Sequence, residues 1–448
     1  MKQLTTLLTI TLLLLAMNGS AQEVTPLSLQ DCINYALQHT DTIKNARINV
    51  EIQKAQNAQV ASAALPRISG HGDFTYFFDP QQTLLPGEFF PGGQPGTFVP
   101  IVFTPRLGAI ASLSGSQTLI DGALFVALKA RKEVVELVRQ TGQLTEENLR
   151  YGVQRAYYSI VIARRNYDIL LRSLAVVRNI DRDVNALHNS GFNELLDVQR
   201  SRVQVNNLET DSSRIESIIA SSEQLLKYQI GMDINTPIVL TDTLIEDYLL
   251  HAADLLNSPI DYNNRTEFKL LNSVVRLNEY QLKRYQYAAL PTLAASGQMG
   301  YNYSSNEFRD LTQFRKNYLF SSFVGLQLNV PIFSGFMRRN QVKEARFNIE
   351  KSKNNLHFLE LSLDFQHAQA QTALKNALLA TESQKRNLDL SNSIVDLANK
   401  KYKAGVGSSL EVNQAQTDLL RSQTNYFQAL LDIVNAQADI QRALGQFK

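Results

Sequence analysis

The 448-residue sequence has no tryptophan, one cysteine and almost no net charge. Lysine and arginine together number 44, and aspartate and glutamate 42, which leaves a net charge of +2. The charge balance therefore leaves no basic surplus that would indicate nucleic-acid binding. The sequence also has no acidic run that would suggest a disordered tail. Cys32 has no partner for an intramolecular disulfide, so we expect Cys32 to be buried and to pack as a small apolar residue. The alternative is that Cys32 is a free reactive thiol.

Catalytic and metal-binding motifs are also lacking. The six histidines are scattered, and none forms HExxH or another ligand pair at helical spacing. GxSxG and CxxC are absent, and the glycines of PGGQPG at residues 91–96 follow no strand-to-helix phosphate-loop pattern. We therefore predict no catalytic residues, no metal site and no cofactor, and we expect that the protein is not an enzyme.

Long hydrophobic runs are missing as well. No later stretch has about 18 uncharged apolar residues in a row, so we expect no transmembrane helix. The N-terminus has the form of a targeting segment, because Lys2 precedes apolar residues 4–16 and small residues lead to Ala21. We predict that residues 1–21 are a signal peptide, which leaves a soluble periplasmic protein or an outer-membrane β-barrel.

Two halves of the chain carry the same markers in the same order. ALPRISG at residues 64–70 matches ALPTLAASG at 289–297, and QTLIDGAL at 117–124 matches VPIFSGFM at 330–337 in form. When Gly191 is aligned with Gly405, four further pairs of similar residues coincide downstream. They are Leu196 with Leu410, Asp197 with Glu411, Val198 with Val412, and Gly231 with Gly445. We predict a tandem duplication, with one unit at residues 22–235 and the other at 236–448.

Each half has the pattern of a helix, two strands, a very long helix, a glycine turn and a shorter helix. Pro66 and Pro291 end the first helices, because proline cannot donate to the helix ladder. Residues 236–260 fit neither helix nor strand, and we place them around the middle of the helical part. The predicted helices are 29–64, 123–187 and 195–229 in the first half and about 262–289, 336–402 and 410–444 in the second, with turns at 188–194 and 403–409.

The long helix at residues 123–187 would span roughly 100 Å at 1.5 Å per residue. The returning helix covers about half of that length, and the helix at 29–64 matches the other half. Apolar and small residues near heptad spacing favour antiparallel coiled-coil packing; they are Leu124, Leu128, Val135, Val138, Leu149, Ala156 and Ala163. The simpler alternative is a long helical bundle without a special purpose.

Four stretches have β character, in hairpins at residues 67–119 and 292–330. They are residues 67–78, 106–119, 292–303 and 318–330, each longer than the roughly 9 to 11 residues that a strand needs to cross a bilayer. Ile68, Phe74, Tyr76 and Phe78 alternate with Ser69, His71, Asp73 and Thr75, an apolar-out and polar-in pattern. Residues 79–105 are rich in proline and glycine and fit an extracellular loop.

Four strands cannot close a barrel alone. An open sheet edge in lipid leaves backbone groups unpaired, at a cost of several kcal/mol each. Three copies of the chain would supply twelve strands, an even number within the bacterial range. We therefore predict a mostly α protein with a membrane β part that forms a homotrimer. In the soluble alternative, the four strands pack as an ordinary sheet against helices.

These motifs together resemble the TolC-like outer-membrane efflux family. The most specific is YKAGVGSSLEVNQAQTDL at residues 402–419, and the likeness runs from LSLQDCINYAL to ALGQ. The resemblance implies a trimer with a twelve-stranded barrel in the outer membrane, continued by an α-helical tunnel across the periplasm. It implies a passive exit duct of an efflux or type I secretion system. A periplasmic adaptor and an inner-membrane pump would be its partners, and drugs, metal ions and proteins all remain open as cargo.

The resemblance also assigns roles to residues of the two turns. The adaptor-docking tips would contain Gly191, Phe192, Gly405, Val406 and Gly407, the last in place of a family arginine. Asp197 and Tyr402 match a network that closes the tip, and Glu411 and Gln414 match the constriction. In the simpler alternative, the glycines only cap helices, and Asp197 and Glu411 only complement the helix dipole.

A different class of protein also fits parts of the sequence. A periplasmic coiled-coil scaffold would share the long helices but would be a soluble product without pore activity. Fractionation of the outer membrane and the mobility of a heat-modifiable trimer separate the two interpretations.

Overall fold

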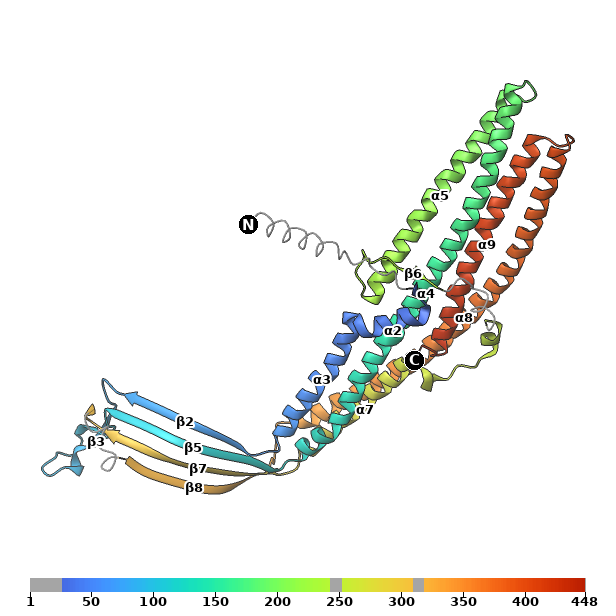
Figure 1. Cartoon of the computed structure of the whole chain (residues 1–448). Coiled ribbons are helices and arrows are strands. Elements are labelled where there is room, and N and C mark those ends of the chain that lie inside the picture. The colour runs from blue at the N-terminus through green and yellow to red at the C-terminus, as the bar shows by residue number, and fades with distance from the viewer. Residues whose placement is uncertain (1–25, 242–251, 309–317, 448) are drawn as a thin grey trace, which may run out of the picture. The chain divides into compact units, whose positions relative to one another are not determined.

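The computed structural model describes residues 26–241, 252–308 and 318–447, so the predicted signal peptide lies outside the described residues. Long helices and a four-stranded sheet dominate these residues (Figure 1). The described residues divide into two compact units, one of residues 26–49, 138–241, 252–272 and 355–447 and the other of residues 50–137, 273–308 and 318–354. Each unit thus contains residues from both halves of the sequence.

The second unit contains an antiparallel sheet in the order β2-β5-β7-β8. The four predicted strands are confirmed, each within a few residues of its expected bounds. β2 and β8 are the edge strands, and each pairs with one neighbour in this chain. The strands are β2 Arg67–Tyr76, β5 Leu107–Ile120, β7 Thr292–Ser305 and β8 Tyr318–Asn329.

The two faces of this sheet differ in polarity. Residues paired directly across antiparallel strands share a face, and Ser69, Ser114 and Gln298 are paired in one such row. Val324 on the opposite face is 90% exposed, so the described residues of this chain do not bury the apolar side. That apolar face carries Ile68, Phe74, Tyr76, Leu113, Met299, Tyr301, Phe320, Val324, Leu326 and Leu328.

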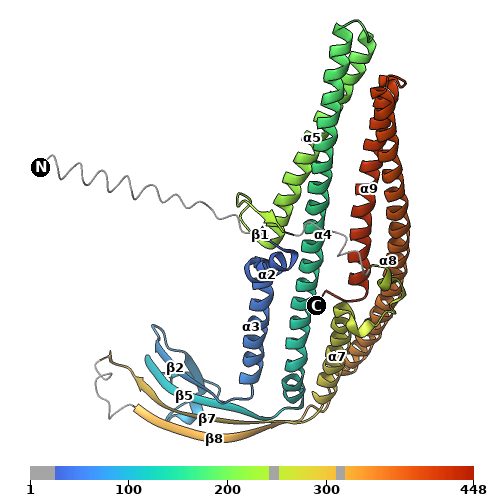
Figure 2. The ribbon, with the colours of Figure 1, turned by 45° about the vertical axis from the view of Figure 1, so that its right-hand side comes forward.

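The α-helices of the second unit meet the sheet at one of its ends (Figures 1 and 2). β2 and β7 begin after helices, whereas β5 and β8 end before helices, and the antiparallel register brings these four ends together. Pro66 and Pro291 lie at the changes from helix to strand, as predicted. The helices concerned are α3 Asp41–Ser62, α4 Gly122–Asn189, α7 Thr266–Tyr287 and α8 Met337–Lys403.

Two helical hairpins reverse direction in the first unit, where the later parts of α4 and α8 are followed by α5 (Leu195–Ile230) and α9 (Ser409–Ala443). Arg178 binds Glu209 at 2.7 Å between α4 and α5. The Ser391 and Ser422 hydroxyls lie 2.8 Å apart between α8 and α9. The predicted long and short helices are therefore confirmed, as are the turns between them.

The core of the first unit lies where α2 (Leu29–His39), α4, α5 and α9 meet. Tyr157 is fully buried there, and its hydroxyl donates to the carbonyl of Leu27 at 3.1 Å. Cys32 is fully buried in the same cluster, which confirms the prediction of a small buried residue.

The prediction of one helix over residues 29–64 was wrong. The helix breaks at Thr40, whose backbone is extended, and α3 begins at Asp41. Thr40 lies against the left-handed backbone of Gly231, where an added Cβ would be 3.1 Å from the Thr40 Cα. A tertiary contact with the end of α5 therefore coincides with the break.

Residues 79–105 were also predicted wrongly as a loop. They contain an antiparallel pair, β3 (Gln82–Pro86) and β4 (Phe98–Val102), because apolar residues in both segments support five paired positions. In the segment 236–260, β6 (Val239–Leu240) pairs in parallel with β1 (Pro26–Leu27), while residues 242–251 lie outside the described residues. The second-half helix begins with a separate 3-10 turn, Tyr262–Asn264, before α7.

Candidate functional site

Both helical hairpins reverse direction through the same backbone motif. Gly191 and Gly405 have φ angles of 80° and 75°, which only glycine adopts without strain. At the first turn, the Gly191 and Phe192 amides donate to the carbonyls of His188 and Leu187, both at 2.9 Å. At the second turn, the equivalent amides donate to Tyr402 and Lys401 at 3.0 and 3.1 Å. This is the Schellman pattern that ends a helix at a left-handed glycine.

The residue after each of these glycines is apolar and faces solvent. Phe192 is 80% exposed and Val406 is 78% exposed. In a Schellman motif this residue commonly packs against its own helix, but here both side chains point away from such cover. The two tips thus present equivalent apolar groups that the described chain does not bury.

Gly407 stands where the resemblance places an arginine. An added Cβ there would lie 2.9 Å from the Lys401 Cβ and 3.0 Å from the Tyr402 amide nitrogen. The Gly407 amide also donates to the Lys401 carbonyl at 3.1 Å. The tightness of the second turn therefore favours glycine at this position.

Asp197 and Glu411 each occupy the third position of their helices, α5 and α9. The Ser408 hydroxyl caps α9 by accepting from the Glu411 amide at 3.2 Å, whereas the Glu194 side chain makes no cap at α5. A carboxylate in a first turn is stabilised by the helix dipole, by about 0.3–1 kcal/mol. The dipole role is therefore supported for both residues, independently of any gating role.

Asp197 and Tyr402 are not joined by a hydrogen bond among the described residues. The Tyr402 hydroxyl is buried and has no hydrogen-bond partner there. Its ring packs against a cluster that includes Val395, Ala398 and Val412. The contact expected between Asp197 and Tyr402 is thus not made within one chain.

A third polar position accompanies Glu411 and Gln414. Gln414 donates to the Asp418 carboxylate at 3.2 Å. Residues 411, 414 and 418 are three and four apart, so they lie on one face of α9. Sequence reasoning missed Asp418, although the i, i+3, i+7 spacing after Glu411 could have identified it.

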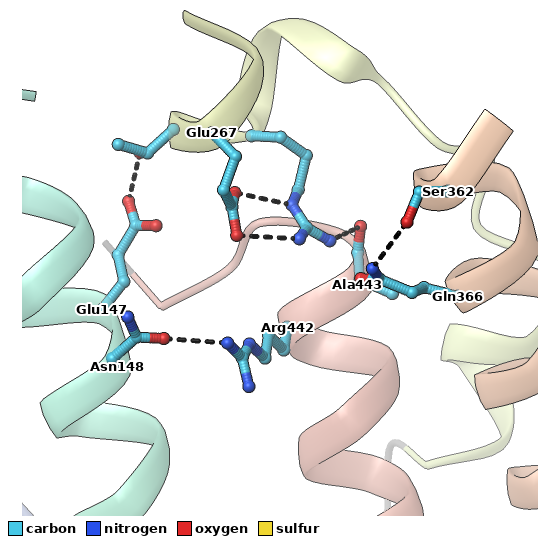
Figure 3. A network of polar contacts seen from close by, with 9 residues as sticks. Glu147, Asn148, Glu267, Ser362, Gln366, Arg442 and Ala443 are labelled. Carbon is cyan, nitrogen blue, oxygen red and sulfur yellow. Dashed lines mark hydrogen bonds and ion pairs between the residues drawn. The ribbon is translucent and has the colours of Figure 1, made fainter. Parts of the chain in front are cut away.

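A polar network ties the second half to the first at the other end of α9 (Figure 3). The Arg265 guanidinium donates two hydrogen bonds to the Glu267 carboxylate, at 3.1 and 3.2 Å, and a third to the Ala443 carbonyl at 3.0 Å. The Arg265 side chain is only 3% exposed. Thr266 donates to Glu147 on α4 at 2.6 Å, so the start of α7 is held to two other helices.

Two carboxylates of this network titrate differently. Burial raises the pKa of Glu147 above its ordinary value, although the Thr266 hydroxyl opposes the shift. Burial would also raise the pKa of Glu267, but the hydrogen bonds and charge of Arg265 prevail and lower it. Glu267 therefore remains the ionised partner of the buried arginine.

Within residues 26–241, 252–308 and 318–447, no group of three or more histidine, cysteine, aspartate or glutamate side chains could hold a metal ion. In the same ranges, no helix has the length and apolar character needed to span a bilayer.

Comparison with known proteins gives consistent matches. Residues 267–446 match the family described as outer membrane efflux protein. The outer membrane protein TolC of Escherichia coli K12 is 22% identical over 346 residues, 75% of this chain and 69% of TolC. Protein CyaE of Bordetella pertussis is 22% identical over 408 residues, 91% of this chain and 81% of CyaE.

The fold has a solved counterpart. The crystal structure of the outer membrane protein VceC from Vibrio cholerae matches with a TM-score of 0.71 at 14% identity, covering 93% of this chain and 96% of VceC. At that identity the match establishes the shared fold.

Proposed function

Because this chain belongs to the TolC-like family of outer membrane efflux proteins, we propose that it is an outer-membrane exit duct of an efflux or type I secretion system. The duct lies in the outer membrane and extends into the periplasm. The observation that carries this proposal is the sheet β2-β5-β7-β8, which has one polar face and one exposed apolar face. An exposed apolar face of this extent suits contact with lipid.

The two edges of the sheet support a trimer. β2 and β8 each pair on one side only, and unpaired backbone groups in lipid cost several kcal/mol each. Pairing β2 of one copy with β8 of the next satisfies both edges, and three copies give a closed ring of twelve strands. We also propose that residues 22–235 and 236–448 are the two duplicated units, since the order of strands and helices recurs in both.

The duct is passive in this proposal, and its partners supply energy and opening. A periplasmic adaptor docks on the tips at Gly191, Phe192, Gly405, Val406 and Gly407, and an inner-membrane pump selects the cargo. The exposed Phe192 and Val406 support this role, because exposed apolar groups at equivalent places suit a protein partner. The family match also favours a channel over an enzyme.

A soluble periplasmic scaffold is the second candidate, since the long helical hairpins alone suit it. The proposed duct predicts protein that fractionates with the outer membrane, requires detergent and forms discrete channels in planar bilayers. A detergent-free, monomeric product without channel activity would instead establish the scaffold.

Glu411→Gln is expected to lower the cation selectivity of the channel. Glu411 from three copies would form a carboxylate ring, and such rings favour cations. Reversal potentials in planar bilayers measure the change, and Asp418→Asn should add to it because Asp418 lies on the same face of α9. Glu382→Gln, an exposed carboxylate on α8, serves as the control. Unchanged selectivity in the Glu411 variant would contradict the proposed carboxylate ring.

Tyr402→Phe is expected to raise the resting single-channel conductance. In the proposed trimer, the Tyr402 hydroxyl reaches Asp197 of a neighbouring copy and helps to close the tip. The hydroxyl has no hydrogen-bond partner among the described residues of its own chain, so its loss should not lower the stability of the folded chain. Tyr228→Phe on α5 is the control, and equal conductance in the two variants would exclude Tyr402 from the gate.

A further inference from the structure

An exposed apolar cluster lies where β8 ends and α8 begins. Ile332 is 94% exposed and Phe333 is 74% exposed, and Phe336 and Met337 are also exposed. The rings of Phe333 and Phe336 contact each other edge to face, with centroids 5.4 Å apart. The cluster continues directly from the last residues of the apolar sheet face, so two apolar surfaces adjoin at this end of the sheet.

The backbone at this cluster is strained. Phe336 has a φ of 64°, and among the described residues it alone has a positive φ without being glycine. A bulky residue in the left-handed region is a genuine outlier, and such outliers concentrate at functional sites. Glycine would adopt this conformation more easily, so the phenylalanine ring is present here at a cost in backbone strain.

Basic residues follow the cluster on α8. Arg339, Lys343 and Arg346 are exposed, and their spacing of four and three residues places them on one helix face. None of them forms an ion pair with a carboxylate among the described residues. At 1.5 Å per residue they lie about 3 to 14 Å along the axis from Met337.

The other helices that join the sheet also have more basic than acidic residues near it. The eleven residues nearest the sheet on α3, α4, α7 and α8 contain ten lysines and arginines but only two carboxylates, Glu279 and Glu344. The whole chain has a net charge of only +2, so the positive charge is concentrated here. Lys129, Lys132 and Arg284 are also exposed, and none of them pairs with a carboxylate in the described part of the chain.

We propose that the Phe333–Phe336 cluster and the basic face of α8 form a collar that binds anionic phospholipid headgroups in the inner leaflet of the outer membrane. This inference rests on the proposed function, which places the sheet in lipid. The headgroup layer is about 5–8 Å thick on each side of the hydrocarbon core, a depth that matches the first turns of α8. Apolar side chains such as phenylalanine bury at the boundary between headgroups and acyl chains, and guanidinium groups bind phosphate oxygens.

The absence of tryptophan permits a direct test, because a single introduced tryptophan is an unambiguous reporter. In liposomes of brominated phosphatidylcholine, the fluorescence of Phe333→Trp is expected to be quenched, and more strongly by bromines near the headgroup than by bromines deep in the chain. Phe323→Trp is the matched control, since Phe323 is exposed on the opposite, polar face of β8. It should respond to aqueous iodide and not to brominated lipid.

Preference for anionic lipid is tested by replacing half of the phosphatidylcholine with brominated phosphatidylglycerol. The lipid beside Phe333→Trp should be enriched in phosphatidylglycerol about fivefold, the effect of roughly one basic residue near an anionic surface. Arg339→Gln, Lys343→Gln and Arg346→Gln together should abolish the enrichment. The same charge change at Lys400, Lys401 and Lys403, at the far end of α8, should leave it intact.

Each other result overturns the collar. Quenching by iodide alone would place the cluster in water, and shielding from both quenchers would place it under a second copy of the chain. Quenching without phosphatidylglycerol enrichment would show that the cluster contacts lipid but does not prefer anionic headgroups. Phe336→Trp repeats the measurement should Phe333→Trp fail to assemble. Channel conductance is recorded from the same liposomes, so its loss in the unchanged protein would refute the proposed duct, whereas normal conductance without lipid contact refutes only the collar.

Discussion

Phe192→Asp combined with Val406→Asp is expected to abolish export by cells while leaving the conductance of the purified channel unchanged. Both side chains are exposed and apolar at the tips of the two hairpins, where the proposed adaptor docks. A buried apolar anchor in an interface commonly contributes 2 kcal/mol or more, so each change should weaken docking by about 30-fold or more. Export is measured in a strain deleted for its own copy, and docking by co-purification of the adaptor.

Leu390→Asp provides the matched control for the tip variants. Leu390 is exposed on α8, about 18 Å along the helix axis from Tyr402, and it belongs to neither of the two Schellman turns. Export should therefore persist in this variant. Normal export and normal adaptor recovery in the double tip variant would show that the tips do not dock the partner.

Glu267→Gln is expected to lower the free energy of unfolding by about 3 kcal/mol. The change leaves the Arg265 guanidinium, whose side chain is 3% exposed, without its carboxylate. An uncompensated buried charge costs about 3–5 kcal/mol, and the partial exposure of Glu267 argues for the lower end. Heat or denaturant unfolding of the detergent-solubilised protein measures the loss.

Two further variants identify the cause of that loss. Removing both charges, with Arg265→Met and Glu267→Leu, should cost less than Glu267→Gln because no buried charge remains unpaired. Glu382→Gln breaks an exposed ion pair with Arg386 and should cost less than about 1 kcal/mol. Equal losses in Glu267→Gln and Glu382→Gln would mean that the Arg265 pair contributes no more than a surface pair.

Local patterns predicted most elements of the fold. Alternating residues such as Ile68 and Ser69 identified strands, because the period of two is a property of the strand itself. Gly191 and Gly405 identified the turns, because a left-handed residue is a local requirement of the helix end. None of these predictions needed to know which helix lies beside which.

Contacts between distant segments explain the misses. The break at Thr40 coincides with a contact to Gly231, about 190 residues away, and no pattern near Thr40 indicated it. The pairing of Arg265 with Glu267 is local, but its burial depends on the Ala443 carbonyl at the end of α9. The β3–β4 pair formed in a segment whose prolines and glycines favoured a loop.

The sequence by itself determined the strands, the long helices, the two glycine turns and the resemblance that indicated an efflux duct. The tertiary structure alone decided the order of the sheet, the polar network at Arg265 and the exposure of Phe192, Val406 and Phe333. The physical reason is the distance along the chain over which each effect acts. Periodicity and backbone preference act over a few residues and can be read along the chain, whereas burial depends on which distant segments meet, and that is settled only when the chain folds.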